Sequence, residues 1–450
     1  MGSFSSFECM KDLLFYMEMP EDFNYSIKTR KKEIKKITAN IFKRQNRKIL
    51  LWGNFGIGKS TLVKQTFWYI HSGNINGDFE DIKFVMLDIP TLVSKQSERL
   101  NKIFSELINY FEKNPKLVLI IENFENLLMG VDTEIKLELR KLLTNPKISV
   151  IATADIDETI IKNNSIYNLF EKIHLEEPVI DDVYGVIKPQ IAEIAKNHNV
   201  IISRKMAMWL INVSIIFSDV SMPKRCIDLI DEVSSYAKLN GIKHVSKNTF
   251  FKCNEFHFEK FLHLSETQKR NIAIHELGHY FVHKASTNFS FTPFLVSIVP
   301  VDLFDGATYL IELPNFVETV DEKYYVSLIG AALAGKIAEE IFNIPLNSGA
   351  SADLIEANEQ AALYSSSLGM NPLLNDKIIV EDQTELVDED CKQDIAYTQN
   401  YILEKARVYA EEIIHKNELY FDAIITELVK NYGILTSYEI EEILKKKQRK

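Results

Sequence analysis

Cysteine is scarce in this chain and scattered along it. Four cysteines occur among 450 residues, at positions 9, 226, 253 and 391, and none belongs to a Cys-x-x-Cys pair. A disulfide framework and a cysteine-based zinc site are therefore excluded. The pattern is typical of a protein kept in a reducing compartment, and we expect a cytoplasmic location.

Long apolar runs are also missing. A membrane-spanning helix needs roughly 20 consecutive apolar residues. The best candidate, Tyr325–Gly335, is shorter and runs directly into Lys336, Glu339 and Glu340. The N-terminus lacks the charged start and apolar core of a signal peptide. The sequence therefore predicts a soluble protein with no integral membrane segment.

The chain has fewer positively charged than negatively charged side chains. The chain carries 52 Lys and Arg residues against 63 Asp and Glu residues, which gives a formal net charge of -11. This balance argues against a nucleic-acid partner. The chain is 46% hydrophobic and 26% charged, an ordinary globular composition, and its length corresponds to roughly two or three domains.

Apolar runs typical of strands alternate with helical stretches between residues 30 and 178. These runs are Ile49–Trp52, Phe84–Leu87, Leu117–Ile121, Ser149–Ala152 and Ile173–Leu175. The alternation predicts an α/β domain with a parallel sheet. Residues 180–245 and 264–450 have a helical pattern, except for a β-like patch at Leu295–Leu313 that Pro300 and Gly306 interrupt.

A phosphate-loop motif follows the first of these runs. It has the form Gly-x-x-x-x-Gly-Lys-Ser between a predicted strand and a predicted helix. Its glycines let backbone N–H groups surround phosphate oxygens, while Lys59 reaches the β- and γ-phosphates and Ser60 binds Mg²⁺. The residues predicted to contact ATP or ADP are Gly53, Asn54, Phe55, Gly56, Ile57, Gly58, Lys59, Ser60 and Thr61.

The strand at Leu117–Ile121 ends differently from that of a standard nucleotide hydrolase. Such enzymes carry an Asp for Mg²⁺ followed by a Glu that activates water, whereas this chain has Glu122 and Asn123. Glu122 can still hold Mg²⁺ through its longer side chain. Asn123 cannot accept a proton, and Glu125, two residues further on, is not expected to replace it. ATP hydrolysis is therefore in doubt.

A second motif, His275-Glu276-Leu277-Gly278-His279, has the form of a zinc-peptidase site. His275 and His279 lie one helical turn apart, which suits two ligands of one Zn²⁺ ion, and Glu276 beside them suits a general base. The motif alone also arises by chance in helices rich in His and Glu. A catalytic site needs a third ligand, and the best candidate is Asp353, which follows a loop of small residues at 348–352. An Asp after such a loop is more often a helix cap.

Residues from about 25 to 240 resemble the first AAA+ module of the Clp chaperone family. The phosphate loop matches, and the segments "LIIENFENLL", "VIATADIDET" and "MPKRCIDLIDEVSS" resemble three segments of that family. The second of these places Thr153 or Ala154 at the sensor position, and the third implies a lid over the nucleotide. The resemblance implies an α/β P-loop AAA+ subdomain at 25–178, a helical lid at 179–255 and assembly into a ring.

Three features of the Clp family are missing from this chain. Its paired arginines, which reach into a neighbour's ATP site, fall on Asn168 and Leu169. Its aromatic pore loop falls near residues 93–97, where no aromatic occurs, and its catalytic Glu falls on Asn123. The resemblance therefore supports nucleotide binding with Mg²⁺ and ring assembly more than it supports powered threading.

Residues from about 264 to 445 resemble the peptidase domain of the FtsH zinc proteases. The matching segments are "LSETQKRNIAIHELGHYFV", "VSIVPVDLFDGATYL", "LIGAALAGKIAEEIF" and "SGASADLIEANEQAALYSSSLGM". The resemblance implies His275, His279 and Asp353 as Zn²⁺ ligands and Glu276 as the base. It also implies a mostly α-helical zinc peptidase domain at 256–450, preceded by the AAA+ domain and a short lead-in at residues 1–24. Glu339 or Glu340 could orient a ligand histidine, but either could equally be solvated.

These observations lead to three hypotheses. The first is a hexameric zinc endopeptidase that cuts extended protein substrates along the 295–313 strand edge. In this hypothesis, ATP bound to the AAA+ module regulates assembly or gating. The second is a peptidase subunit of a mixed ring, in which an active partner supplies ATP hydrolysis and the missing arginines. The third is a non-enzymatic, nucleotide-dependent scaffold, which the complete set of zinc ligands disfavours.

Overall fold

The computed structural model describes residues 12–18, 30–72, 81–94, 97–128, 133–301, 305–313, 316, 319–345, 347–375, 378–379 and 388–448. Most of the predicted lead-in, and positions 95–96 of the segment aligned with the pore loop, lie outside these residues. The chain divides into two compact units. The N-terminal unit comprises Met1–Asn197 and Ser218–Asp231, and the C-terminal unit comprises His198–Phe217 and Glu232–Lys450. Each is described by itself.

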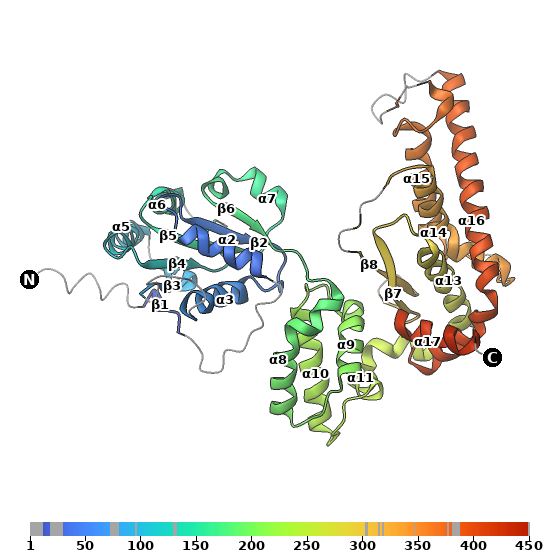
Figure 1. The fold of residues 1–450 in the computed structure, drawn as a ribbon, viewed down its shortest axis with the longest axis horizontal. Helices are drawn as coiled ribbons and strands as arrows, with labels where there is room; N and C mark the ends of the chain where they lie inside the picture. Colours follow the sequence, from blue (N-terminus) through green and yellow to red (C-terminus); the bar gives the residue numbers. More distant parts are fainter. Residues whose placement is uncertain are drawn as a thin grey trace, which may run out of the picture. The chain divides into compact units, whose positions relative to one another are not determined.

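The N-terminal unit contains a six-stranded sheet (Figure 1). In chain order its strands are β1 (Leu14–Tyr16), β2 (Lys48–Trp52), β3 (Lys83–Leu87), β4 (Leu117–Ile121), β5 (Ser149–Ala154) and β6 (Glu171–His174). Their order across the sheet is β1-β3-β4-β5-β2-β6. All neighbours are parallel except β1, which pairs antiparallel with β3. The five predicted strands and their parallel arrangement are confirmed, whereas β1 was not predicted.

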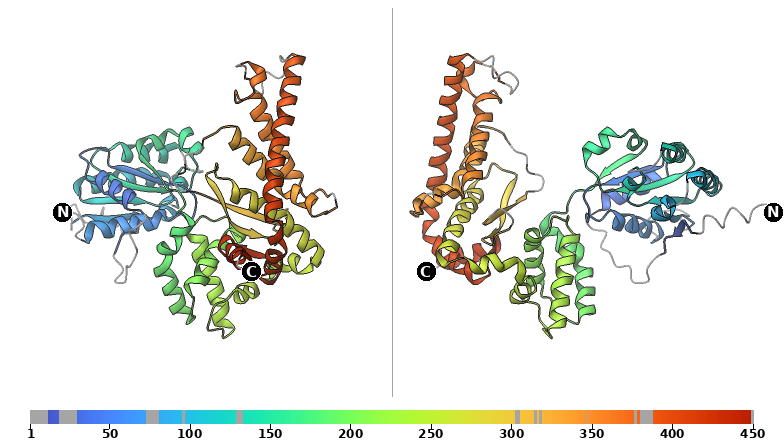
Figure 2. Two further views of the ribbon diagram at one scale, coloured as in Figure 1. Left: turned by 45° about the vertical axis from the view of Figure 1, so that its right-hand side comes forward. Right: turned by 180° about the vertical axis from the view of Figure 1, so that it is seen from behind.

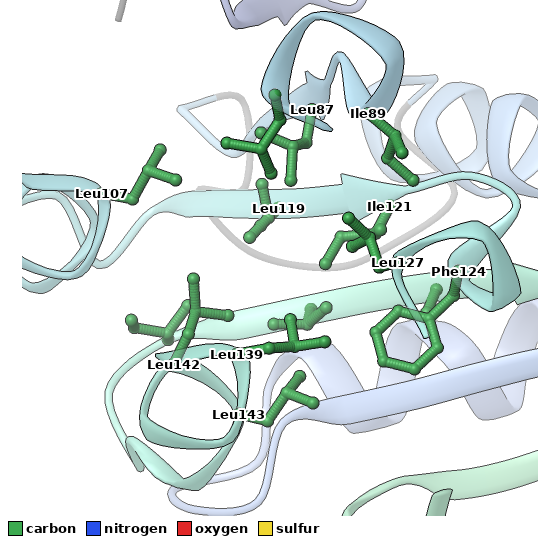
Figure 3. Packing of buried hydrophobic residues seen from close by; sticks show 14 of the residues in the cluster. Leu87, Ile89, Leu107, Leu119, Ile121, Phe124, Leu127, Leu139, Leu142 and Leu143 are labelled. Atoms are coloured by element: carbon green, nitrogen blue, oxygen red, sulfur yellow. The ribbon is translucent and has the colours of Figure 1, made fainter. Parts of the chain in front are cut away.

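Helices cover both faces of this sheet because its strands bury apolar side chains on both sides. The helices of the α/β part are α2 (Lys31–Ile41), α3 (Lys59–His71), α4 (Ile89–Val93), α5 (Ser97–Lys113), α6 (Thr133–Thr144) and α7 (Glu158–Asn163). On one face, α5 and α6 pack against alternate residues such as Leu119 and Ile121 of β4 (Figure 3). On the other face, α2 and α3 pack against Val118 and Ile120.

Four further helices follow the sheet, and three of them lie within residues 180–245, which the sequence predicts to be helical. They are α8 (Ile180–His198), α9 (Arg204–Phe217), α10 (Lys224–Leu239) and α11 (Lys247–Cys253). The division into compact units assigns nearly all of α8 and the first half of α10 to the N-terminal unit and the remaining parts to the C-terminal unit. The boundaries proposed for a lid at 179–255 therefore stay a prediction.

The C-terminal unit is mostly helical, with a small sheet at its side (Figures 1 and 2). Its remaining helices are α12 (Glu259–His263), α13 (Glu266–Ala285), α14 (Glu322–Ile341), α15 (Ser351–Ser366), α16 (Glu389–Lys430) and α17 (Ser437–Gln448). Short 3₁₀ turns lie at Glu255–Phe258 and Pro372–Leu374. The helices α13, α14 and α16 pack together and form the centre of the unit. Among the described residues, no helix combines the length and apolar character required to span a bilayer.

The small sheet has the order β8-β7-β9 and is antiparallel. Strands β7 (Phe291–Ser297) and β8 (Ala307–Glu312) correspond to the predicted β-like patch, and β9 (Ile434–Thr436) joins them from near the C-terminus. Strand β8 forms one edge of the sheet, and among the described strands it pairs with β7 alone. This edge lies next to α13, which carries the zinc-peptidase motif.

Candidate metal centre and phosphate loop

The three predicted metal ligands come together in the C-terminal unit. His275 and His279 lie one turn apart on α13, and Asp353 lies in the first turn of α15. Nε2 of His275 and Nε2 of His279 lie 3.1 and 3.4 Å from Oδ2 of Asp353, and the two Nε2 atoms lie 3.1 Å apart. Two imidazoles and one carboxylate that converge on a point could hold a metal ion, and they match the three-ligand donor set that catalytic zinc sites use.

The local structure of α13 explains how the histidines are placed. Ser265 accepts a hydrogen bond from the backbone N–H of Gln268, whose side chain accepts one from the N–H of Ser265. This capping box fixes the start of α13 at Ser265. Because the helix starts at a defined residue, His275 and His279 project from one defined face.

The second ring nitrogen of each histidine is also engaged. Nδ1 of His275 lies 2.9 Å from Oε1 of Glu339, and Nδ1 of His279 lies 2.8 Å from the carbonyl oxygen of Ala331. Both partners belong to α14. An acceptor at Nδ1 keeps the proton there and leaves Nε2 free to bind a metal. Glu339 thus contacts the centre, whereas Glu340 forms an ion pair with Arg407.

Two glycines allow α13 and α14 to approach closely enough for these contacts. A β-carbon at Gly335 of α14 would lie 2.5 Å from Nε2 of both His275 and His279. A β-carbon at Gly278 of α13 would lie 2.9 Å from the β-carbon of Ala338. Real β-carbons do not reach such distances, so both positions require glycine for the observed packing.

Glu276 is buried beside the ligands, with 6% of its surface exposed. The hydroxyl of Thr308, on β8, lies 3.0 Å from its Oε2 and 2.8 Å from its backbone carbonyl oxygen. Burial raises the pKa of Glu276, against the opposing attraction of His279 and His275. A carboxylate held in this way, with a raised pKa, is suited to accept and release a proton.

Charge around the two histidines favours a bound cation. Burial lowers the pKa of His275, but hydrogen bonds to Asp353 and Glu339 outweigh this effect and raise it to about 10. Burial raises the pKa of Asp353, but the hydrogen bonds from His275 and His279 prevail and hold it well below its usual range. Without a metal, a proton therefore occupies the site. The donors and charges fit a divalent cation, which would displace that proton.

A cavity of about 1440 Å³ opens over this centre. Side chains of α13, β7, β8, α14 and α15 form its walls, including the apolar Phe291, Leu310 and Leu328. The predicted ligands and Glu276 also face it. A cavity of this size next to a strand edge can take an extended peptide, whose main chain pairs with β8 and whose side chains enter the apolar part.

In the N-terminal unit, the predicted phosphate loop joins β2 to α3. Gly56 and Gly58 have φ angles of +88° and +97°, which side-chain-bearing residues rarely adopt. Lys59 is 6% exposed, and its ammonium donates to the carbonyl oxygens of Gly53 and Asn54 at 2.7 Å. It also forms an ion pair with Asp155, which follows β5. The loop and the start of α3 together form an anion-binding geometry.

The phosphate loop also contacts the beginning of α10. The N–H groups of Ser221 and Lys224 donate to the carbonyl oxygens of Phe55 and Gly56, at 3.2 and 3.3 Å. A β-carbon at Gly56 would lie 2.8 Å from the β-carbon of Lys224. The segment that resembles the lid of the Clp family thus begins directly against the loop.

The end of β4 has an unexpected conformation. Asn123 has a φ of +52° and an exposed side chain, and its N–H donates to the hydroxyl of Thr153 at 3.2 Å. Glu122 is half-buried. The following 3₁₀ turn, Phe124–Leu127, carries Glu125 into the interior, where it is 8% exposed. Sequence reasoning discounted Glu125 and gave no weight to Asp155, Thr308 or Gly335, because only the tertiary fold brings these residues to the two sites.

Comparison with known proteins agrees with this geometry. Residues 262–443 match the model of Peptidase family M41. Residues 49–176 match that of the ATPase family associated with various cellular activities (AAA).

Curated relatives match roughly the first half of the chain. The chaperone protein ClpB of Mycoplasmoides gallisepticum is 25% identical over 231 residues, which cover 48% of this chain and 32% of that protein. The Clp protease ATP-binding subunit ClpC of Staphylococcus aureus is 24% identical over 233 residues, which cover 49% and 28%. The chain thus spans less than a third of the length of these relatives.

A cryo-electron-microscopy structure of Hsp104 with ATPγS and casein is 17% identical and aligns with a TM-score of 0.47 over 56% of this chain and 47% of that one.

The two family matches cover the two sites described above, the phosphate loop and the candidate metal centre. The chain therefore joins an AAA domain to an FtsH-type peptidase family M41 domain.

Proposed function

We propose that this chain is a zinc-dependent endopeptidase that cuts protein substrates at the centre formed by His275, His279 and Asp353. The observation that carries the proposal is the convergence of these three donors beside the buried carboxylate of Glu276. Three protein ligands would leave a four-coordinate zinc ion one position for water or a substrate carbonyl. The cavity and the β8 edge supply a binding place for an extended chain.

The residues divide the chemistry among them. When bound, zinc supplies a Lewis acid that polarises the scissile carbonyl and lowers the pKa of water. Glu276 accepts the proton of the attacking water and delivers it to the leaving amine. Glu339 orients the imidazole of His275, and Thr308 holds the carboxylate of Glu276. The edge of β8 aligns the substrate main chain through backbone hydrogen bonds.

The test is a paired measurement of zinc content and casein cleavage on the full chain. The wild type is expected to bind one zinc ion and to cleave casein, and Glu276→Gln to keep the zinc and lose cleavage by a factor of about 10² or more. Glu259→Gln, at an exposed position of α12, serves as the matched control and should cleave normally. A wild type with neither zinc nor cleavage would instead support a scaffold.

We further propose that the AAA domain binds ATP or ADP with Mg²⁺ through the loop from Gly53 to Thr61 and through Glu122. The positive φ angles of the loop and the position of Lys59 support this assignment. Binding of a fluorescent ATP analogue tests it. Lys59→Ala is expected to weaken binding at least about tenfold, because the lysine contacts the β- and γ-phosphates.

A ring is the proposed assembly, either a hexamer of this chain or a mixed ring. The mixed ring is favoured by Asn168 and Leu169, which occupy the positions of the paired arginines of the Clp family. In such a ring, a partner supplies those arginines. Mass measurement on complexes isolated from the native cell distinguishes the two, because a homo-oligomer alone contradicts the mixed ring.

A further inference from the structure

The carboxylate of Glu125 is buried inside the N-terminal unit, and the contacts it makes there do not replace all of its lost hydration. It lies in the 3₁₀ turn after β4, and 8% of its surface is exposed. Its Oε2 is buried and has no hydrogen-bond partner among the described residues. A buried carboxylate oxygen in this state is costly, which points to a missing ligand such as a water molecule or an ion.

The backbone explains why Glu125 points inward. Asn123 adopts a left-handed conformation that turns the chain at the end of β4. The turn leaves Asn123 exposed, buries Phe124 completely in the core and carries Glu125 back toward the sheet. Asparagine tolerates this conformation better than glutamate does, so the local backbone matches the residue at position 123.

The surroundings of Glu125 are those of a nucleotide site. Its carboxylate accepts a hydrogen bond from the backbone N–H of Asp155 and lies within the electrostatic reach of Lys59. The side chain of Asp155 is in turn the ion-pair partner of Lys59. Lys59 is the phosphate-loop lysine, so Glu125 lies near the residue that reaches the β- and γ-phosphates of a bound nucleotide.

Burial is the main electrostatic influence on Glu125. It raises the pKa of this carboxyl, and the negative charge of Asp155 adds to the effect, whereas Lys59 opposes it. Buried Tyr167 is a further neighbour, and burial and the charge of Glu125 raise its pKa to about 12, so its phenol stays neutral. A desolvated carboxylate of this kind accepts a proton more readily than an exposed one.

We propose that Glu125 is the general base for ATP hydrolysis in this chain, in the role that Asn123 cannot fill. Its unpartnered Oε2 accepts a proton from water as the water oxygen bonds to the γ-phosphorus. The bond from that phosphorus to the bridging oxygen breaks, ADP leaves, and the proton passes to solvent with phosphate. The inference rests on the nucleotide binding proposed above, and it revises the sequence expectation that Glu125 cannot substitute.

The experiment measures binding and hydrolysis separately on the full chain. Binding is followed with a fluorescent ATP analogue, hydrolysis by phosphate release, and the protein-bound nucleotide is extracted and identified. Glu125→Gln is expected to bind the analogue within about threefold of wild type, to release phosphate about 10²-fold or more slowly, and to retain intact ATP. Asn123→Gly, which suits the left-handed turn, and Glu193→Gln, on the exposed side of α8, should hydrolyse normally.

Each contrary outcome has a distinct meaning. A wild type that does not bind the analogue overturns the nucleotide-binding proposal itself. A wild type that binds but does not hydrolyse overturns the role of Glu125 alone, as does a Glu125→Gln protein with the wild-type rate. If Glu125→Gln does not fold or bind, Glu125→Asp keeps the charge and shortens the reach. It should then hydrolyse at least about tenfold more slowly, and an undiminished rate overturns the proposal.

Discussion

The hydroxyl of Thr308 lies 3.0 Å from the carboxylate Oε2 of Glu276 and 2.8 Å from the carbonyl oxygen of the same residue. This single side chain connects the proposed catalytic base on α13 to the strand proposed to bind substrate. A shift of β8 would therefore change the orientation of the base. Through these two contacts with Glu276, Thr308 links the proposed binding of substrate at β8 to the proposed proton transfer by Glu276.

The first prediction concerns Thr308. Thr308→Val removes the hydroxyl and keeps the shape, so Glu276 loses its anchor. We expect kcat for peptide cleavage to fall roughly 10- to 100-fold, because small misplacements of a catalytic group have effects of this size. KM and zinc content should stay near wild type. Thr308→Ser keeps the hydroxyl and should recover most of kcat. Equal losses in the two variants would contradict an anchoring role.

A second prediction concerns the packing of α13 against α14. Gly335→Ala places a β-carbon against the Nε2 atoms of His275 and His279, which must move apart. We expect zinc affinity to fall about 100-fold or more, since those nitrogens are the ligands. Gly185→Ala, in α8, is the matched control, because its β-carbon meets nothing within 4 Å. That variant should bind zinc normally and be more stable by up to about 1 kcal/mol. Normal zinc binding by Gly335→Ala would refute the close packing.

A third prediction separates the neighbours Glu339 and Glu340. Glu339→Gln weakens the hydrogen bond that orients His275, so zinc affinity should fall roughly 10- to 100-fold. Glu340→Gln removes the ion pairs with half-exposed Arg407 and Lys336 and should leave zinc affinity unchanged. Competition with a chromogenic chelator measures both. Similar affinities for the two variants would mean that Glu339 does not support the ligand.

A fourth prediction concerns the metal-free protein. The pKa of His275 rises from an ordinary 6.5 to about 10 in the folded state, so the folded chain holds a proton that the unfolded chain releases. This contribution to the free energy of unfolding is fully present below pH 6.5 and is lost as the pH rises through about 10. Urea unfolding after chelation should show this decline. The decline should be smaller in His275→Asn, and an equal decline in both proteins would assign the titration to another group.

The sequence predicts the central sheet well because its strands are continuous apolar runs with clear breaks between them. The candidate metal-binding motif is equally visible in the sequence, since His275 and His279 satisfy a local spacing rule. Asp353 lies 74 residues beyond His279, as the numbering shows, and the chain alone offered no rule to connect them. It became a candidate ligand mainly through the resemblance to a known peptidase, and the fold then brought it to the histidines.

Other features depend on contacts that no local pattern encodes. Strands β1 and β9 have three residues each and acquire their conformation by pairing with distant strands. Gly335 looked like any small residue in an apolar helix, and its role emerges only when α13 lies against it. Glu125 was discounted because it lies two residues beyond Asn123, and the sequence does not reveal the left-handed turn at Asn123 that changes the direction of the chain there.

The edge position of β8 has a consequence for which proteins the proposed peptidase can cut. An edge strand recognises the main chain, which all proteins share, and not a particular set of side chains. In a folded protein most main-chain groups are already paired, so they cannot add to this edge. Susceptibility to cleavage would then depend on the conformational state of the substrate more than on its sequence. The enzyme would act as a sensor of lost structure, with the AAA domain controlling which chains reach the edge.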